Sequence, residues 1–410
     1  MSAVKVQSVG KDAMKAQQWS TTRSGRRQLV LGAACLAVSV LTVACGTSSG
    51  GGPVGESSAP VTNDASAAAQ ARDKVADMRA GKEFGAPPSS APKPQPGKKI
   101  WGVAYSLDAP GGREFAEAAK EAGKMFGWDV TVTDSAYTPS TAVDLIRQGI
   151  AAGADGLLQY SIDCASTQSA LQDAKQAGIK IVAVEGVDCN DAGGTGKPLF
   201  DYNVHYQQGE YLKWTVALAV AQAQWAIAAT DGHAVGMYLN QTDSAFGPVN
   251  TRAFNDELKK CGSCGKPVPV DFVGADIGTT LEQKVATALQ QHPDVNVVAV
   301  PYDALVSGGV GTAVRQAGRD VKLIAGEGQQ ATLDGIRAKT VAATLGLVPE
   351  WEAYAGMDNL NRLFNGRPGE ASGQGFGLVD ATNIDQQSAG RSYVPPADFK
   401  TAYQKAWGVG

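Results

Sequence analysis

Histidine is scarce in this sequence, and basic residues are not in excess. The 410 residues include three histidines, His205, His233 and His292, which stand far apart and share no metal-ligand spacing. Three isolated histidines suggest no Ser-His-Asp set, so histidine-based catalysis is not expected. Lysine and arginine number 36 against 40 acidic residues, which gives a formal net charge of −4. No basic surface is therefore expected, and nucleic acid is not an expected partner.

An uninterrupted apolar run of membrane-spanning length is also missing. The N-terminal run 29–43 follows three arginines and is shorter than the ~20 residues of a span, although typical of a signal peptide. We predict a signal peptide over residues 1–44; a single N-terminal membrane helix is the alternative, which length and flanks disfavour. Cys45 follows Val43-Ala44 in an arrangement that resembles a bacterial lipobox, although Thr42 occupies the usual leucine position. Lipidation of Cys45 would anchor the protein.

Few cysteines remain once the leader and the lipid site are set aside. Cys261 and Cys264 lie in "KKCGSCGKP", between a predicted helix and a predicted strand. Zinc would need a second ligand pair, and a thioredoxin-type motif would open a helix, so a local disulfide is preferred. Cys164 and Cys189 each follow a predicted strand. If those strands are parallel neighbours, the two thiols could meet as a second disulfide in an oxidising compartment.

The segment 45–97 is rich in Gly, Ser and Pro. "GTSSGGGPVGESSAP" predicts a flexible chain and "GAPPSSAPKPQPG" predicts an extended polyproline-like chain. Between them "AAAQARDKVADMRAG" has the composition of a short helix. We expect residues 45–97 to be a flexible tether between the lipidated cysteine and a globular part.

Strands and helices alternate regularly after Lys98. Short apolar runs such as "KKIWGVAYSL" and "IKIVAVEG" are separated by helical patterns such as "GREFAEAAKEAGKMFG". This order is typical of right-handed βαβ units and parallel sheets. A long helical pattern over 207–230 separates two such series. The sequence thus predicts an α/β protein with two doubly wound, Rossmann-like lobes.

Several stretches resemble the type I periplasmic binding proteins, the ribose-binding-like solute receptors of ABC transporters. They include "YTPSTAVDLIRQGIAAGADGLLQYSID", "ALQDAKQAGIKIVAVEG" and "LQQHPDVNVVAVPYDALVSGGVGTAVRQAGRDVKLIAGEG". The resemblance implies lobes joined by a three-strand hinge, with crossings near 201–203, 346–348 and 374–377. It assigns residues 98–202 plus 347–375 to the N-terminal lobe and 203–346 plus 376–410 to the C-terminal lobe. Sugar-responsive repressors share this fold but carry an N-terminal helix-turn-helix. Here a signal peptide and a tether are expected at that position, which argues against a repressor.

Candidate ligand-binding residues follow from the rule that ligands bind beyond the carboxyl ends of the strands in open α/β sheets. Carboxylates and amides can hold hydroxyl groups, and aromatic rings can cover the apolar face of a sugar. For each polar residue the alternative is a helix N-cap or a turn residue. The polar candidates are Ser106, Asp108, Asp163, Glu185, Gln241, Asp243, Asn250, Asp276, Tyr302, Asp303 and Glu327, and the aromatic ones are Tyr105, Tyr160, Tyr302 and Trp351.

The resemblance supports Glu185, Tyr302-Asp303 and Glu327, which stand where relatives carry sugar-binding residues. Gly186 and Asn250 stand where relatives often carry arginine. The pocket thus keeps acids and loses its usual bases. This departure weakens the case for ribose or galactose and favours a polyol, an unusual sugar or a ligand that bears an amine.

The expected function is a solute-binding lipoprotein of an ABC importer. It would act as a monomer on the extracytoplasmic face of the membrane, held there only by the lipid on Cys45, and pass a sugar or polyol to a permease. A lipoprotein that presents its closed form to a receptor kinase is the alternative. No cofactor, metal or enzymatic activity is expected: "GGTGKP" resembles a phosphate loop, but Pro198 follows Lys197 in place of Ser or Thr.

Overall fold

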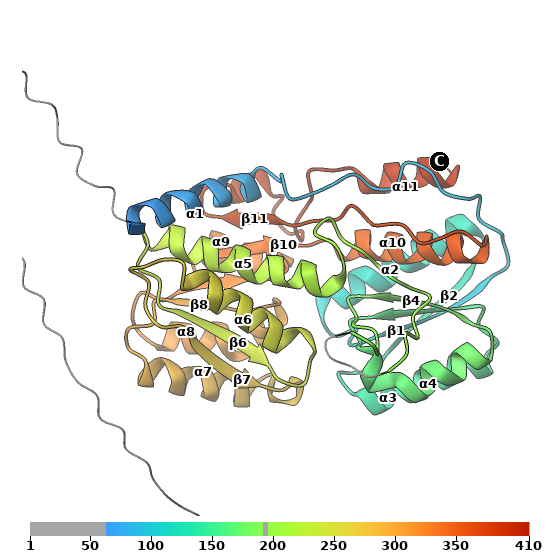
Figure 1. Ribbon diagram of the computed structural model, residues 1–410, viewed down its shortest axis with the longest axis horizontal. Helices are drawn as coiled ribbons and strands as arrows, with labels where there is room; N and C mark the ends of the chain where they lie inside the picture. Colours follow the sequence, from blue (N-terminus) through green and yellow to red (C-terminus); the bar gives the residue numbers. More distant parts are fainter. Residues whose placement is uncertain (1–62, 192–195, 410) are drawn as a thin grey trace, which may run out of the picture. The chain divides into compact units, whose positions relative to one another are not determined.

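The computed structural model describes residues 63–191 and 196–409, in which the two α/β series form two separate sheets (Figure 1). The signal peptide, the lipobox and Cys45 lie outside the described residues. Within the described part, no helix is both long enough and apolar enough to cross a membrane.

The first lobe is built around a five-stranded sheet. Its elements are β1 (Lys99–Ala104), α2 (Pro110–Phe126), β2 (Asp129–Asp134), α3 (Pro139–Ala151), β3 (Gly156–Tyr160), α4 (Cys164–Gln176), β4 (Lys180–Val184), β5 (Tyr202–Asn203), α10 (Pro349–Phe364) and α11 (Phe399–Trp407). The strand order is β2-β1-β3-β4-β5, and all pairs are parallel.

The second lobe is built around a six-stranded sheet. Its elements are α1 (Asn63–Arg79), α5 (Tyr211–Ala229), β6 (Gly236–Gln241), α6 (Phe246–Leu258), β7 (Val268–Phe272), η1 (Gly274–Asp276), α7 (Thr279–Gln291), β8 (Val297–Ala299), η2 (Val306–Val310), α8 (Gly311–Gln316), β9 (Lys322–Ala325), α9 (Gln330–Arg337), β10 (Ala343–Gly346), β11 (Gly377–Asp380) and η3 (Ile384–Gln386). The strand order is β11-β10-β9-β8-β6-β7, in which only β10 and β11 pair antiparallel. The predicted pair of doubly wound α/β lobes is confirmed.

Local sequence accounts for most of these elements. In α2 the residues Phe115, Ala119, Ala122 and Phe126 recur at helical spacing and are all buried. The helix begins at a proline and ends before Gly127, whose φ of 68° suits glycine. Strands β3 and β4 are apolar almost throughout; β3 is buried along its whole length and β4 is buried after Lys180, as central strands covered on both faces should be.

The chain passes between the sheets at the three places that the resemblance implies. It leaves the first sheet after β5, returns after β10, and enters the second sheet again at β11. Helix α10 then packs against α2, β3 and β4 of the first lobe. A hinge made of such crossings permits the lobes to close over a ligand.

The closing helix α11 does not lie where we expected. Trp407 packs against Phe126 with ring centroids 4.5 Å apart, and Lys400 Nζ is 2.9 Å from Glu121 Oε2. Both partners belong to α2, so the assignment of 376–410 as a whole to the C-terminal lobe is wrong for α11. The apolar face of the helix fits the first lobe, and the chain crosses a further time after β11 to reach it.

The predicted flexible tether is wrong for residues 63–97, which pack on both lobes. Helix α1 lies against α5 and β11, and Arg79 forms an ion pair with Asp380. Residues 80–97, here called the N-terminal strap, then run from the second lobe to the first (Figure 1). The helical composition of the middle of this segment is confirmed by α1.

Hydrogen bonds hold the N-terminal strap along its length. Gly85 N donates to Gly373 O at 2.8 Å, close to the third crossing. Asn361 Nδ2 donates to Pro92 O at 2.7 Å, and Trp128 Nε1 donates to Gln95 O at 2.6 Å, both on the first lobe. The strap is therefore a fixed part of the folded protein.

Candidate functional site

A cavity of about 580 Å³ lies between the two lobes at the carboxyl ends of the parallel strands. Ser106 and Glu185 line it just beyond β1 and β4, while Tyr302 and Glu327 line it just beyond β8 and β9. Small-molecule sites typically occupy ~300–1,000 Å³. The cavity therefore has the position and the size of a small-molecule site.

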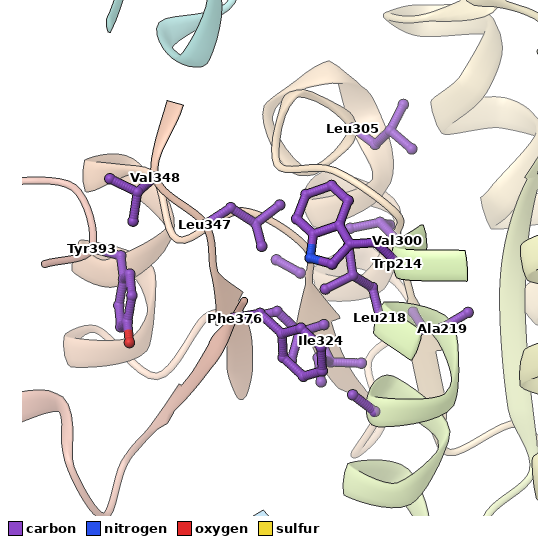
Figure 2. Close-up of a cluster of buried hydrophobic side chains, with 14 of the residues drawn as sticks. Trp214, Leu218, Ala219, Val300, Leu305, Ile324, Leu347, Val348, Phe376 and Tyr393 are labelled. Atoms are coloured by element: carbon purple, nitrogen blue, oxygen red, sulfur yellow. The ribbon is translucent and has the colours of Figure 1, made fainter. Parts of the chain in front are cut away.

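Aromatic rings form much of the cavity wall. Tyr105 and Tyr137 meet edge to face with centroids 5.2 Å apart, and Trp214 stacks on Tyr206 at 3.9 Å. Trp214 belongs to the apolar cluster of Figure 2, to which α5, the strands of the second sheet and the crossings contribute. The aromatic residues that line the cavity are Tyr105, Tyr137, Tyr160, Tyr211, Trp214, Tyr238, Phe246 and Tyr302.

Carboxyl groups are the only ionisable groups apart from tyrosine among the described residues that line the cavity. They come from both lobes, and no lysine, arginine or histidine accompanies them within residues 63–191 and 196–409. The carboxyl residues are Asp163, Glu185, Asp188, Asp191, Asp243 and Glu327.

Three of these carboxylates are held by backbone N–H groups. Asp188 accepts from Leu199 N at 2.9 Å, and Asp243 accepts from Gly274 N at 3.0 Å. Asp163 joins the two lobes, because Oδ1 accepts from Val187 N and Oδ2 accepts from Ala245 N, each at 3.0 Å. Burial nevertheless raises the pKa of the Asp163 carboxyl above its ordinary value.

Glu185 adopts an unusual backbone conformation at the end of β4. Its φ is 54°, as is that of Ser161 beyond the neighbouring strand β3, and Ser161 Oγ donates to Glu185 Oε2. A positive φ is uncommon for residues other than glycine, and such strain costs ~1–3 kcal/mol and tends to persist at functional sites. Burial raises the pKa of the Glu185 carboxyl. The surrounding fold thus holds this carboxyl in place despite two costs.

Glu352 lies behind Glu185 on α10 and is 1% exposed. Its pKa is raised well above the ordinary value by burial and then by the charge of Glu185. Its carboxyl accepts a long hydrogen bond from Gln374 Nε2 at 3.4 Å. Glu352 does not line the cavity itself, but it shares the environment of Glu185.

Glu327 stands on the opposite lobe, next to the buried Asp303. Asp303 accepts from Gly326 N, Glu327 N and Gln329 N at 2.7–3.0 Å, and so fixes the turn after β9. Glu327 Oε2 accepts from Asp303 N at 3.2 Å. Burial, followed by the charges of Asp303 and Glu185, raises the pKa of Glu327 well above its ordinary value. We call Glu185, Glu327 and Glu352 the cavity carboxyl cluster.

The structure places most of the predicted polar candidates on the cavity. Tyr302 donates to Gln241 Oε1 at 2.7 Å, so these two share one part of the wall. Contact of any of these residues with a ligand stays a prediction. The polar candidates that line the cavity are Ser106, Asp163, Glu185, Gln241, Asp243, Asn250, Tyr302 and Glu327.

Four predicted residues do not line the cavity. Asp108 is exposed, and Asp276 pairs with Lys284 at 2.7 Å while it accepts from Val273 N. Asp303 fixes the turn described above. Trp351 is completely buried and stacks between Phe84 and Phe399. The turn-residue alternative describes Asp276 and Asp303, and Trp351 is a core residue.

Sequence reasoning missed part of the aromatic wall and Glu352. Tyr211, Trp214 and Leu218 line the cavity from the first turns of α5. Their spacing of three and four residues was the available signal, because it places them on one face of the helix. Tyr137 lies in the loop after β2 with φ of 60°, and nothing in the local sequence indicated its position.

The four cysteines of the globular part form the two expected disulfides. Cys164 and Cys189 are paired with Cα atoms 5.1 Å apart, and Cys261 is paired with Cys264. The first pair lies beyond the neighbouring parallel strands β3 and β4. Among the described residues, the one group of three possible metal-ligating atoms is Cys164, Asp188 and Cys189, whose sulfurs are bonded to each other.

This architecture matches a known protein family and several solved structures. A family model described as "Periplasmic binding protein domain" matches residues 103–368. No curated protein sequence matches the chain.

Solved structures share the fold at low sequence identity. An ABC transporter periplasmic solute binding protein from Actinobacillus succinogenes 130z, with bound D-allose, is 17% identical over 71% of this chain and 100% of that chain, with a TM-score of 0.61. A solute binding protein from Mycobacterium smegmatis, with bound glycerol, is 18% identical over 73% and 100% of the two chains, with a TM-score of 0.59. One from Agrobacterium vitis, bound with α-D-tagatopyranose, is 15% identical over 70% and 96%, with a TM-score of 0.61.

Proposed function

Because the chain belongs to the periplasmic binding protein family, we propose that it captures a small polar solute and delivers it to the permease of an ABC importer. The observation that supports this most is the cavity, which is lined by polar and aromatic groups from both lobes at the ends of their strands. Closure of the lobes about the crossings would bury the solute, and opening would release it. The fold neighbours with bound D-allose, glycerol and tagatose favour a hydroxyl-bearing solute.

A thermal-shift screen tests this proposal. The mature protein is heated with single sugars, polyols and amines, and a ligand at 100 times its dissociation constant should stabilise it by ~2.7 kcal/mol. Glu327→Ala should then weaken binding of that compound by about tenfold or more, as expected for the loss of a charge-assisted hydrogen bond. Asp276→Asn is the matched control, because Asp276 lies outside the cavity and should leave affinity unchanged. A compound that binds equally well to both variants would place the solute elsewhere.

The sequence also supports attachment to the membrane through a lipid on Cys45, which would hold the monomer on the extracytoplasmic face near its permease. A Cys45→Ala variant expressed in its host should lose lipid labelling and leave the membrane fraction. Retention of lipid label by that variant would refute the anchor without affecting the solute-binding proposal.

A further inference from the structure

The cavity is lined by acidic groups, and among the described residues that line it no cationic side chain could compensate a carboxylate charge. Six carboxyl residues, half-buried or exposed, line it from both lobes, and the fully buried Glu352 lies behind Glu185. Buried carboxylates are costly unless they are paired or hydrogen-bonded. Asp163, Asp188 and Asp243 are held by backbone N–H groups, whereas the cavity carboxyl cluster has few such partners. The carboxyl groups with the fewest compensating partners are therefore those of Glu185, Glu327 and Glu352.

A bare metal ion does not fit this arrangement. Metal sites need several ligand atoms that converge on one point. Within residues 63–191 and 196–409, no three carboxylate oxygens of the cavity converge in this way; the one convergent group contains the Cys164–Cys189 disulfide. A volume of about 580 Å³ also exceeds the space that one ion fills. A ligand that supplied a counter-charge here would therefore be a larger molecule than one ion.

The aromatic wall suits an organic cation. Tyr211 is buried and lines the cavity together with Glu185 and Glu327, and its pKa is raised first by burial and then by the charge of Glu185. Aromatic faces attract ammonium groups, and the attraction is strongest where water is excluded. The rings of Tyr160 and Trp214 line the same cavity and are nearly fully buried. Rings and carboxylates together are the two elements of ammonium recognition.

Hydrogen-bond acceptors in the cavity also lack donors. Asn250 lines the cavity and is 4% exposed, and its Oδ1 has no hydrogen-bond partner among the described residues. Gln222 also lines the cavity, but its amide nitrogen is not available as a donor to Asn250, because it donates to Val300 O and Ala325 O at 2.7 and 3.2 Å. An unpaired buried acceptor costs ~1–3 kcal/mol. A ligand that brings N–H or O–H donors would satisfy Asn250 Oδ1.

We propose that the solute is an organic cation that bears an ammonium group, and that Glu185 and Glu327 from opposite lobes supply its counter-charge while the aromatic wall surrounds it. This inference rests on the proposed function and names the chemical class of the solute. Hydroxyl groups on the same molecule remain compatible with the remaining acceptors, so an amino sugar and a hydroxylated quaternary ammonium compound both belong to the class.

The test compares charged compounds with neutral isosteres by calorimetry at neutral pH. The panel consists of matched pairs: choline with the neutral alcohol in which carbon replaces the charged nitrogen, and glucosamine with glucose. We expect at least one cation to bind about tenfold or more tightly than its neutral partner. Binding of a neutral member with no preference for its cation overturns this inference and leaves the solute-binding proposal standing. Binding of neither member of any pair, in a panel extended to further amines and sugars, contradicts both.

Variants then locate the charge recognition. Glu185→Gln and Glu327→Gln keep the shape and one acceptor but remove the charge, and each should weaken binding of the cation by about tenfold or more. Both should leave the affinity for a neutral partner almost unchanged. Asp276→Asn is again the control. Equal losses for the cation and its neutral partner would show that the two glutamates act only as hydrogen-bond acceptors, and would overturn the inference.

Discussion

Helix α10 carries two buried carboxyl groups whose surroundings differ in charge. Asp358 is 0% exposed and Glu352 is 1% exposed. Asp358 Oδ2 accepts from Arg362 Nε at 2.7 Å, and its Oδ1 accepts from Trp407 Nε1 at 2.8 Å. Glu352 instead neighbours Glu185, which is also acidic. Asp358 thus has a cationic partner on the same helix, whereas the neighbour of Glu352 is another acid.

The comparison distinguishes a buried carboxyl that is paired within the protein from buried carboxyls that lack a partner near the cavity. The Arg362 cluster, as we call it, consists of Asp358, Arg362, Glu370 and Trp407, which are joined by ion pairs and a hydrogen bond. Arg362 also donates to Ser90 O of the N-terminal strap. A buried carboxylate with its own partner contributes to the fold, and one without a partner is a cost that the rest of the fold must offset. In the cavity carboxyl cluster that cost falls on Glu185 and Glu327, which line the cavity, and on Glu352 behind them.

Breaking the Arg362 cluster should have the largest effect. Arg362→Met leaves Asp358 buried without its counter-charge and releases the strap at Ser90, so the free energy of unfolding should fall by ~3–5 kcal/mol. Urea denaturation measures the change. The double variant with Asp358→Asn should regain part of the loss, because no buried charge is then unpaired. A loss below about 1 kcal/mol in the single variant would mean that the compensation at Asp358 contributes little.

Removing a carboxyl from the cavity carboxyl cluster should instead raise the free energy of unfolding. The pKa of Glu352 is raised in the folded protein above its ordinary 4.5, by burial and by Glu185, with Glu327 adding to the shift and Tyr206 opposing it. The folded state therefore binds its proton more tightly than the unfolded state, so stability from this group is full below pH 4.5 and is lost as pH rises toward the folded pKa. Glu352→Gln removes that loss.

The ligand-free Glu352→Gln protein should thus be more stable than wild type at pH 7, by on the order of 1 kcal/mol, and the difference should shrink toward zero near pH 4.5. Thermal unfolding of both proteins across this pH range gives the measurement. A wild type that is the more stable of the two at pH 7 would contradict the view that this carboxyl is uncompensated.

The smallest effect is expected at the rim of the Arg362 cluster. Glu370 pairs with Arg362 Nη1 at 2.7 Å, but its side chain is 50% exposed. Glu370→Gln should lower the free energy of unfolding by less than about 1 kcal/mol, and added salt should reduce the effect further. Denaturation at low and high salt checks this. A loss as large as that of Arg362→Met would show that the ion pairs of this cluster cannot be ranked by burial.

The amino-acid sequence determined the features that depend on local pattern. Alternating apolar runs and helical spacing were enough to predict the two α/β lobes, because these periods reflect which face of each element is buried. Strand ends then located Glu185 and Glu327, and neighbouring strands brought Cys164 and Cys189 together, because parallel strands end at the same edge of a sheet.

Only the tertiary structure decided which groups meet from distant parts of the chain. Asp303 also follows the end of a strand and carries a carboxyl like Glu327, yet its carboxyl accepts from backbone N–H groups. Glu352 reaches Glu185 because α10 returns to the first lobe after the second sheet is complete, and the N-terminal strap crosses both lobes for the same reason. Such contacts join surfaces that no sequence window contains. Local pattern therefore fixed where polar groups emerge, and long-range packing fixed which of them remained without a partner in the cavity.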